Sequence, residues 1–110
     1  MIAIDLTLDD LKESRIKYEE GQSVTYDVVQ SAKKAYFLFH AKFEALQSSH
    51  RFMTNDFKSA LLGFDVALEL FYCRARQLLE TGRTDSLEIF GYYLEYLDCY
   101  HDLAGAINSN

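Results

Sequence analysis

Proline is absent from the 110-residue sequence, and this absence is the first guide to the fold. A β-rich or loop-rich domain rarely lacks proline, because proline is a common residue of turns and strand edges. A bundle of helices joined by short turns can do without it. Cysteine is scarce as well. Cys73 and Cys99 are too few for a disulfide scaffold, so we expect two reduced thiols and a cytoplasmic location.

Long apolar runs are also missing. None approaches the roughly 18 residues of a membrane-spanning helix, and no basic region followed by an apolar core marks a signal peptide at the N-terminus. We therefore expect no membrane contact. The five glycines are scattered, so there is no phosphate-binding loop. At this length, with 49% apolar residues, we expect one domain, residues 1–110, with a substantial buried core.

The most regular stretch is residues 55–81, which predicts one long helix. Thr54 suits its N-cap, and Gly82 suits the position just past its end. Ten apolar residues recur at spacings of three and four and predict a broad core face. They are Phe57, Ala60, Leu61, Phe64, Ala67, Leu68, Phe71, Ala75, Leu78 and Leu79. Gly63 is unusual inside a helix; a close helix crossing is one explanation, and simple tolerance is the other.

Three further helices are expected around this one. Thr7 and Asp10 resemble a capping box at the start of a short helix over about 8–20, which Gly21 would end. Two long helices are predicted over about 25–48 and about 86–107. Between them these segments predict an all-α fold: an antiparallel bundle of three long helices plus a short N-terminal one, with the helix over 55–81 in the middle.

The last of these helices carries its own start signal and its own apolar pattern. Asp85 and Glu88 form a second capping box. The residues that we expect to face the core are Leu87, Phe90, Tyr93, Leu94, Leu97, His101 and Ala104, with their neighbours. The alternation of Ile2, Ile4 and Leu6 at the N-terminus suggests an extended arm, packed on the bundle or added to the edge of a partner's sheet.

Several apolar residues lie off the predicted core faces. A second stripe on the helix over 55–81 consists of Leu62, Val66, Leu70 and Cys73, and the helix over 25–48 adds Phe37 and Leu38. We expect the first helix to cover them, or a second copy of the chain to do so. A homodimer interface would then contain Phe37, Leu38, Leu62, Val66 and Leu70.

Positive charge is missing from the last quarter of the chain. Residues 1–83 hold 12 acids and 11 bases, whereas residues 84–110 hold five acids and no base, so most of the net charge of −6 lies there. Glu88, Glu95, Asp98 and Asp102 share one face of the predicted helix, and Tyr92, Tyr96 and Tyr100 run along one flank of it. Tyrosine is enriched at interfaces. This face therefore predicts binding to a basic protein partner, while repulsion from phosphate disfavours direct nucleic-acid binding. The alternative is an acidic solvent face with tyrosines at the core boundary.

Motifs for chemistry are weak. His40 and Glu44, and Asp98 and His101, each lie one helical turn apart, but neither pair is the Glu-x-x-His motif of a di-iron bundle. No nucleophile elbow accompanies either cysteine. We expect no metal, no cofactor and no catalytic residue, and hence no enzyme. The pattern favours a non-catalytic protein-binding regulator, such as an inhibitor, an immunity-type protein or an adaptor. The alternatives are a structural or oligomer-forming subunit and a metal-dependent helical enzyme.

Overall fold

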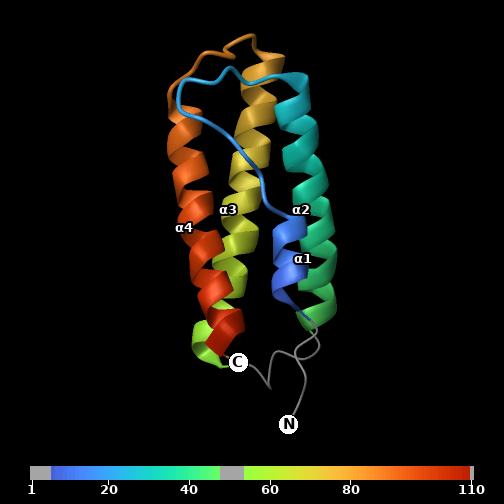
Figure 1. The fold of residues 1–110 in the computed structure, drawn as a ribbon. Helices are drawn as coiled ribbons and strands as arrows, with labels where there is room; N and C mark the ends of the chain where they lie inside the picture. The colour runs from blue at the N-terminus through green and yellow to red at the C-terminus, as the bar shows by residue number, and fades with distance from the viewer. Residues whose placement is uncertain (1–5, 48–53, 110) are drawn as a thin grey trace.

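Four α-helices make up the fold. The structure, a computed structural model, describes residues 6–47 and 54–109. The helices are α1 (Leu8–Glu13), α2 (Tyr26–Gln47), α3 (Asn55–Glu80) and α4 (Glu88–Ser109), and the described residues contain no strand. The three long helices lie side by side, and α3 packs against both α2 and α4 (Figure 1). The predicted all-α bundle with one short N-terminal helix is confirmed.

The ends of α3 are fixed as the sequence indicates. The Thr54 hydroxyl accepts a hydrogen bond from the Phe57 N–H at 3.1 Å. At the other end Gly82 adopts a φ of 75°, and the Arg83 N–H donates to the Leu78 carbonyl at 2.9 Å. Eight of the ten predicted core residues of α3 are buried, and Ala60 and Leu79 are partly buried against the same core. Helix propensity, capping and the apolar pattern agree here, so the sequence determines this helix well.

The N-terminal helix is much shorter than predicted. Thr7 and Asp10 form the expected capping box, but α1 ends at Glu13 and not near residue 20. Ile16 and Tyr18 are both buried. Residues two apart cannot lie on one side of a helix, but they lie on the same side of an extended chain. The chain therefore leaves the helix, and we call residues 14–24 the strap. Gly21, with a φ of 83°, lies in a turn of the strap and does not end a helix.

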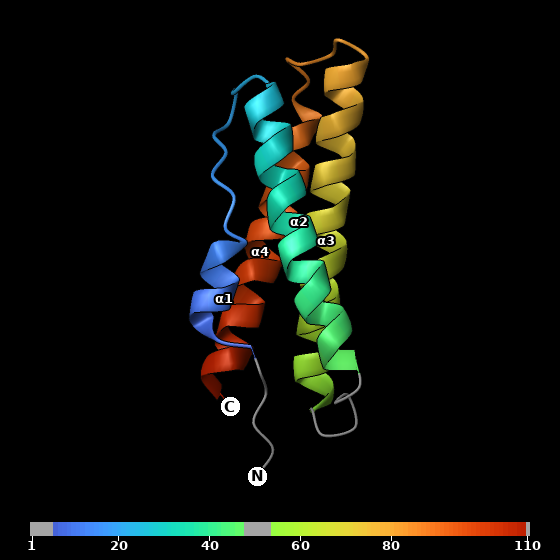
Figure 2. The same ribbon diagram turned by 90° about the vertical axis from the view of Figure 1, so that its right-hand side faces the viewer.

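The strap and α1 together form the side of the bundle opposite α3. Figure 1 shows the strap rising from α1 across the front of α3 before it returns over the top to α2, and Figure 2 shows α1 and the strap on the far side of the bundle from α3. At the top, the Val24 N–H donates to the Thr84 carbonyl at 2.9 Å, and the Ser23 hydroxyl donates to Asp85 at 2.6 Å. Asp85 thus links the loop before α4 to the strap. The capping box predicted for Asp85 and Glu88 is wrong, because α4 begins only at Glu88.

The core face of α4 agrees with the prediction only in part. Tyr93 is buried, and Phe90, Leu97 and Ala104 are partly buried against the core, as expected. Leu87, Leu94 and His101 are exposed, although we expected them to face the core. The buried residues of this helix are Ile89, Tyr93, Tyr96 and Leu103. The strap explains the difference, because tyrosine rings pack beneath it and their hydroxyls bond to its backbone. The alternating residues before Leu6 and the segment 48–53 lie outside the described residues.

Candidate functional site

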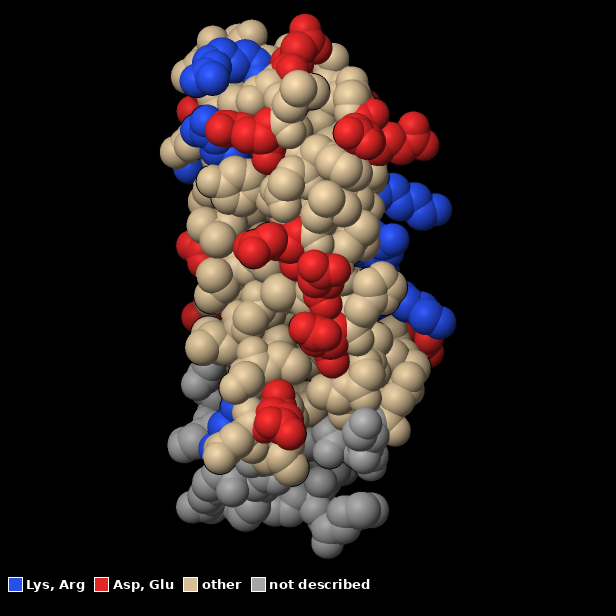
Figure 3. Space-filling model, turned by 90° about the vertical axis from the view of Figure 1, so that its left-hand side faces the viewer, with Lys and Arg blue, Asp and Glu red and all other residues tan. Residues whose placement is uncertain are grey.

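The acidic residues of α4 lie on an open surface. Glu88, Glu95, Asp98 and Asp102 are all exposed. Figure 3 shows acidic side chains running down this face of the molecule, with basic side chains toward its edges. Glu88 forms an ion pair with Arg74 of α3. Within the described parts of the chain, no ion pair involves the other three carboxylates. We call Glu88, Glu95, Asp98 and Asp102 the acidic line.

The three tyrosines predicted to flank the acidic line do not form one exposed surface. Tyr96 is fully buried: its hydroxyl donates to the Ser14 carbonyl at 2.7 Å and accepts from the Ile16 N–H at 2.8 Å. Its assignment to a partner-binding surface is therefore wrong. Tyr100 is partly buried and carries the Arg15 guanidinium over its ring, 5.2 Å from the centroid, so it faces the strap. Tyr92 borders the acidic line, since it lines one hollow with Glu88 and Glu95.

Tyr92 contributes to a shallow hollow within the acidic line. The hollow is about 230 Å³ in volume and is lined by Glu88, Gly91, Tyr92 and Glu95. A Cβ atom at Gly91 would have no neighbour within 4 Å, so the floor is open to solvent. The carboxylates of Glu88 and Glu95 thus lie beside the Tyr92 ring and the exposed backbone of Gly91. A lysine or arginine side chain has the matching form, since its apolar stem can pack while its charged end reaches a carboxylate.

The second candidate surface is the apolar stripe of α3. The exposed fractions of Leu62, Val66 and Leu70 are 54%, 43% and 45%. We keep the name apolar stripe for these three residues. The expectation that the first helix covers them is wrong, because α1 lies across the bundle, against α2 and α4. The stronger apolar face of α3 turns inward, and the groove between α2 and α4 on the opposite side receives α1 and the strap.

Phe37 and Leu38 belong to different surfaces. Both are exposed, by 54% and 38%. Phe37 lies on the α3 side of α2, with its ring 6.3 Å from that of Tyr72. Leu38 precedes Lys42 by one helical turn, and Lys42 pairs with Asp10 of α1, so Leu38 lies on the α1 side. The five residues predicted for one oligomer interface therefore do not form one patch.

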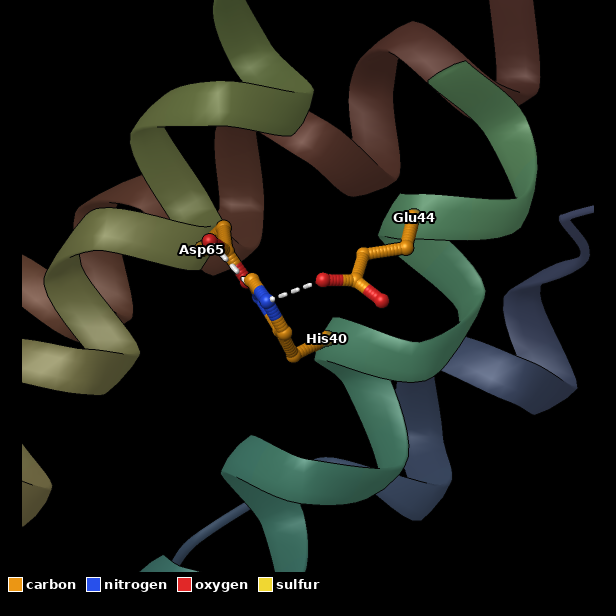
Figure 4. Close-up of polar contacts among 3 residues, drawn as sticks. All are labelled: His40, Glu44 and Asp65. Atoms are coloured by element: carbon orange, nitrogen blue, oxygen red, sulfur yellow. Dashed lines mark hydrogen bonds and ion pairs between the residues drawn. The ribbon is translucent and has the colours of Figure 1, made fainter. Parts of the chain in front are cut away.

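The structure adds Asp65 of α3 to the pair of His40 and Glu44 that the sequence indicated on α2. Asp65 is buried, with 5% of its surface exposed, and its carboxylate lies 3.1 and 3.2 Å from Nδ1 of His40 (Figure 4). Nε2 of His40 lies 3.1 Å from Glu44. The hydrogen bond to Asp65 is the main cause that raises the pKa of His40. Because both ring nitrogens are engaged, the cluster is arranged to join α2 to α3, with no nitrogen left open for a ligand.

In the sequence of α3, Asp65 and Tyr72 lie between the core residues and the apolar stripe, where exposure to solvent is expected, but both are buried. Tyr36 stacks against His40 and Tyr72, with ring centroids 5.2 and 6.0 Å apart. Residues seven apart on α3 share one side of the helix. That spacing places Asp65 and Tyr72 on the same side, but only the position of α2 shows that this side is covered.

Other chemistry finds little support in the described residues. No group of three or more His, Cys, Asp or Glu side chains among residues 6–47 and 54–109 is placed to hold a metal ion. Burial and the nearby acids raise the pKa of the Cys99 thiol, which works against an activated nucleophile. No helix in the described chain is long and apolar enough to cross a membrane. No protein-family model, curated protein or solved structure matches the chain.

Proposed function

We propose that this protein is a non-catalytic, protein-binding regulator of the cytoplasm: an inhibitor, immunity-type or adaptor protein whose acidic line receives a basic partner. The observation that carries the proposal is the row of exposed carboxylates on α4, three of them without an ion pair in the described chain. Glu88, Tyr92, Glu95, Asp98 and Asp102 form the contact in this proposal. Tyr96 supports it only from inside, by holding α4 to the strap.

Electrostatics gives this contact a definite character. Each exposed ion pair contributes only about 0.2–1 kcal/mol, so a row of carboxylates mainly speeds the encounter with a basic surface and orients it. Exposed charges are screened within about 8–10 Å at physiological salt. We therefore expect association with the partner to slow as salt is raised, with a smaller change in the rate of dissociation.

The test compares two variants of equal charge. In the first, Glu95→Gln, Asp98→Asn and Asp102→Asn remove three charges from the acidic line. The control removes three exposed charges elsewhere, through Asp9→Asn, Glu19→Gln and Glu20→Gln. Each tagged protein is used to capture partners from the lysate of its source cell, at several salt concentrations. The proposal predicts a partner that the natural chain and the control capture and the first variant does not. Equal capture by the natural chain and both variants rejects the acidic line as the contact.

The second candidate function is an oligomer-forming or structural subunit. It is favoured by the exposure of Phe37 and of the apolar stripe on neighbouring helices. A homodimer through these residues would bury them. Light scattering at high micromolar concentration distinguishes the two functions, since a monomer throughout that range rejects self-association.

A further inference from the structure

The apolar stripe and the acidic line lie next to each other and follow the same course. Glu88 pairs with Arg74 near the C-terminal end of α3. A Cβ atom at Gly63 would lie 3.9 Å from the Cys99 sulfur. Asp102 lines one cavity with Ser59 near the start of α3. These three positions show the antiparallel register of α3 and α4, so the acidic line extends along the full length of the stripe.

The stripe opens on the same edge of α3 that meets α4. Ser59, Gly63, Val66, Leu70 and Arg74 follow one another at spacings of three and four, and they therefore form one ridge. Three members of this ridge, Ser59, Gly63 and Arg74, lie next to α4. Val66 and Leu70 lie between them, and Leu62 lies one turn before Val66. The apolar stripe therefore has the acidic line as its neighbour along one side.

Size and charge indicate what would cover such a surface. From Leu62 to Leu70 is eight residues, or about 12 Å along a helix, which is a little over two turns. The stripe has the spacing of an apolar row on a single helix, and one helix laid along it would bury all three side chains. Cations along one flank of that helix would face the acidic line. A second copy of this chain fits less well, because it carries a net charge of −6 and adds another acidic line.

We propose that the apolar stripe and the acidic line together form a docking surface for one amphipathic helix of a partner protein, with apolar residues on one face and lysine or arginine along one flank. This inference rests on the proposed function, since it uses the same acidic line, and it adds the apolar half of the contact and the form of the partner. The hollow beside Tyr92 then receives one basic side chain of that helix.

The absence of tryptophan from this chain gives a direct assay. The probe is a 14-residue synthetic peptide with leucines on one helical face, one tryptophan among them, lysines along one flank and glutamines elsewhere. A second peptide contains the same residues in an order that separates the apolar ones. Tryptophan emission shifts to shorter wavelength when the ring leaves water, so titration with the protein reports burial of the apolar face. We expect the shift with the first peptide and none with the second.

Three variants assign the contact. The first variant, the stripe variant, combines Leu62→Gln, Val66→Gln and Leu70→Gln, which replace the apolar stripe by a polar residue of good helix propensity. Leu38→Gln and Leu87→Gln change two exposed leucines outside it. The third is the variant that removes Glu95, Asp98 and Asp102. We expect the first and third variants to bind the ordered peptide at least tenfold more weakly than the natural chain, and the Leu38/Leu87 variant to bind it equally well. Urea unfolding confirms that each variant is folded.

The outcomes separate this inference from the function on which it rests. If the stripe variant binds as the natural chain does while the acid variant does not, the helix-docking inference is wrong and the acidic contact remains. Equal binding of both peptides has the same meaning. If the acid variant binds the ordered peptide as the natural chain does, the acidic line is not the contact, and both the proposed function and the helix-docking inference are rejected. If light scattering shows a dimer that the stripe variant abolishes, the occupant of the stripe is a second copy, and the partner helix is rejected.

Discussion

Replacing Tyr96 by phenylalanine removes one oxygen atom from the centre of the contact between α4 and the strap. The Tyr96 hydroxyl donates to the Ser14 carbonyl and accepts from the Ile16 N–H, at 2.7 and 2.8 Å. Ser14 and Ile16 are both buried, as is the ring of Tyr96. In the phenylalanine variant these two backbone groups have lost their partner, and the missing oxygen leaves too little room for a well-bonded water.

The expected cost follows from those two groups. A buried donor or acceptor left without a partner costs about 1–3 kcal/mol, so the loss of two partners in Tyr96→Phe should lower the free energy of unfolding by about 2–6 kcal/mol. For a chain of this length, at about 4 °C per kcal/mol, the unfolding temperature should fall by about 8–24 °C. It is also a large part of the 5–15 kcal/mol by which small domains are stable.

Two neighbouring tyrosines provide matched controls. The Tyr93 hydroxyl donates to the Ile16 carbonyl at 2.8 Å, but that carbonyl also accepts from Arg15 at 2.7 Å. Tyr93→Phe therefore leaves it bonded and should cost about 1 kcal/mol. Tyr92 is partly buried in the hollow on the acidic line, and Tyr92→Phe should stay within about 0.5 kcal/mol of the natural chain.

Urea unfolding followed by circular dichroism at 222 nm measures all three variants. The reasoning is refuted if Tyr96→Phe unfolds at the same urea concentration as Tyr92→Phe. Alkaline pH gives an independent check, because burial raises the pKa of Tyr96 to about 12 from its ordinary value of 10.0. A raised pKa means that the protonated form is favoured by folding, so this stability is complete below pH 10 and is lost as pH rises from 10 toward 12. The free energy of unfolding of Tyr96→Phe should therefore fall less between pH 10 and pH 12 than that of the natural chain.

Four further substitutions test other parts of the fold. His40→Gln should destabilise the chain more at pH 5.5 than at pH 8.5 in urea unfolding. The reason is that the raised pKa of His40 gives stability that is complete below pH 6.5 and is lost as pH rises through the folded-state pKa. A difference in unfolding free energy between the natural chain and the variant that grows with pH contradicts this. Gly63→Ala should stabilise α3 by about 1 kcal/mol, since its Cβ meets only the Cys99 sulfur at 3.9 Å, whereas Gly82→Ala should destabilise by about 1 kcal/mol at its φ of 75°. Equal melting temperatures for these two glycine variants would count against both arguments. Thr54→Ala should cost about 1 kcal/mol in the same measurement, through loss of the bond to the Phe57 N–H.

The parts of the fold that were predictable are those decided within one helix. Thr54, Gly82 and the spacing of the apolar residues between them define α3 without reference to its neighbours. The capping box at Thr7 is equally local. The end of α1 was not predictable in this way, because Ile16 and Tyr18 lie in an extended strap held by hydroxyls about 80 residues later in the chain. The sequence left two explanations for Gly63, a close helix crossing and simple tolerance. A Cβ atom at this position would meet the Cys99 sulfur at 3.9 Å, an ordinary contact, so alanine would fit and a close crossing does not explain the glycine.

The candidate site was predictable in its charges and not in its tyrosines. Carboxylates are costly to bury, so the exposure of Glu95, Asp98 and Asp102 follows from their type and spacing alone. A tyrosine can serve the core or an interface equally well, because it has both an apolar ring and a hydroxyl. Tyr96 is in the core because the strap supplies a carbonyl and an N–H for that hydroxyl. The burial of Asp65 was not predictable either, because the histidine that pairs with its carboxylate, His40, lies on another helix.

The exposed stripe of α3 follows from where the strap is held. The described chain has only α1 and the strap to cover a side of the bundle that the long helices leave open. Hydrogen bonds from Tyr93 and Tyr96 fix the strap in the groove between α2 and α4, and the ring of Tyr18 reaches Phe71 on the inner face of α3, 5.9 Å between centroids. The inner face of α3 is thus covered within the described chain, whereas Leu62, Val66 and Leu70 on its outer face are exposed. The proposed partner helix would cover these three residues, at the edge that the acidic line already borders.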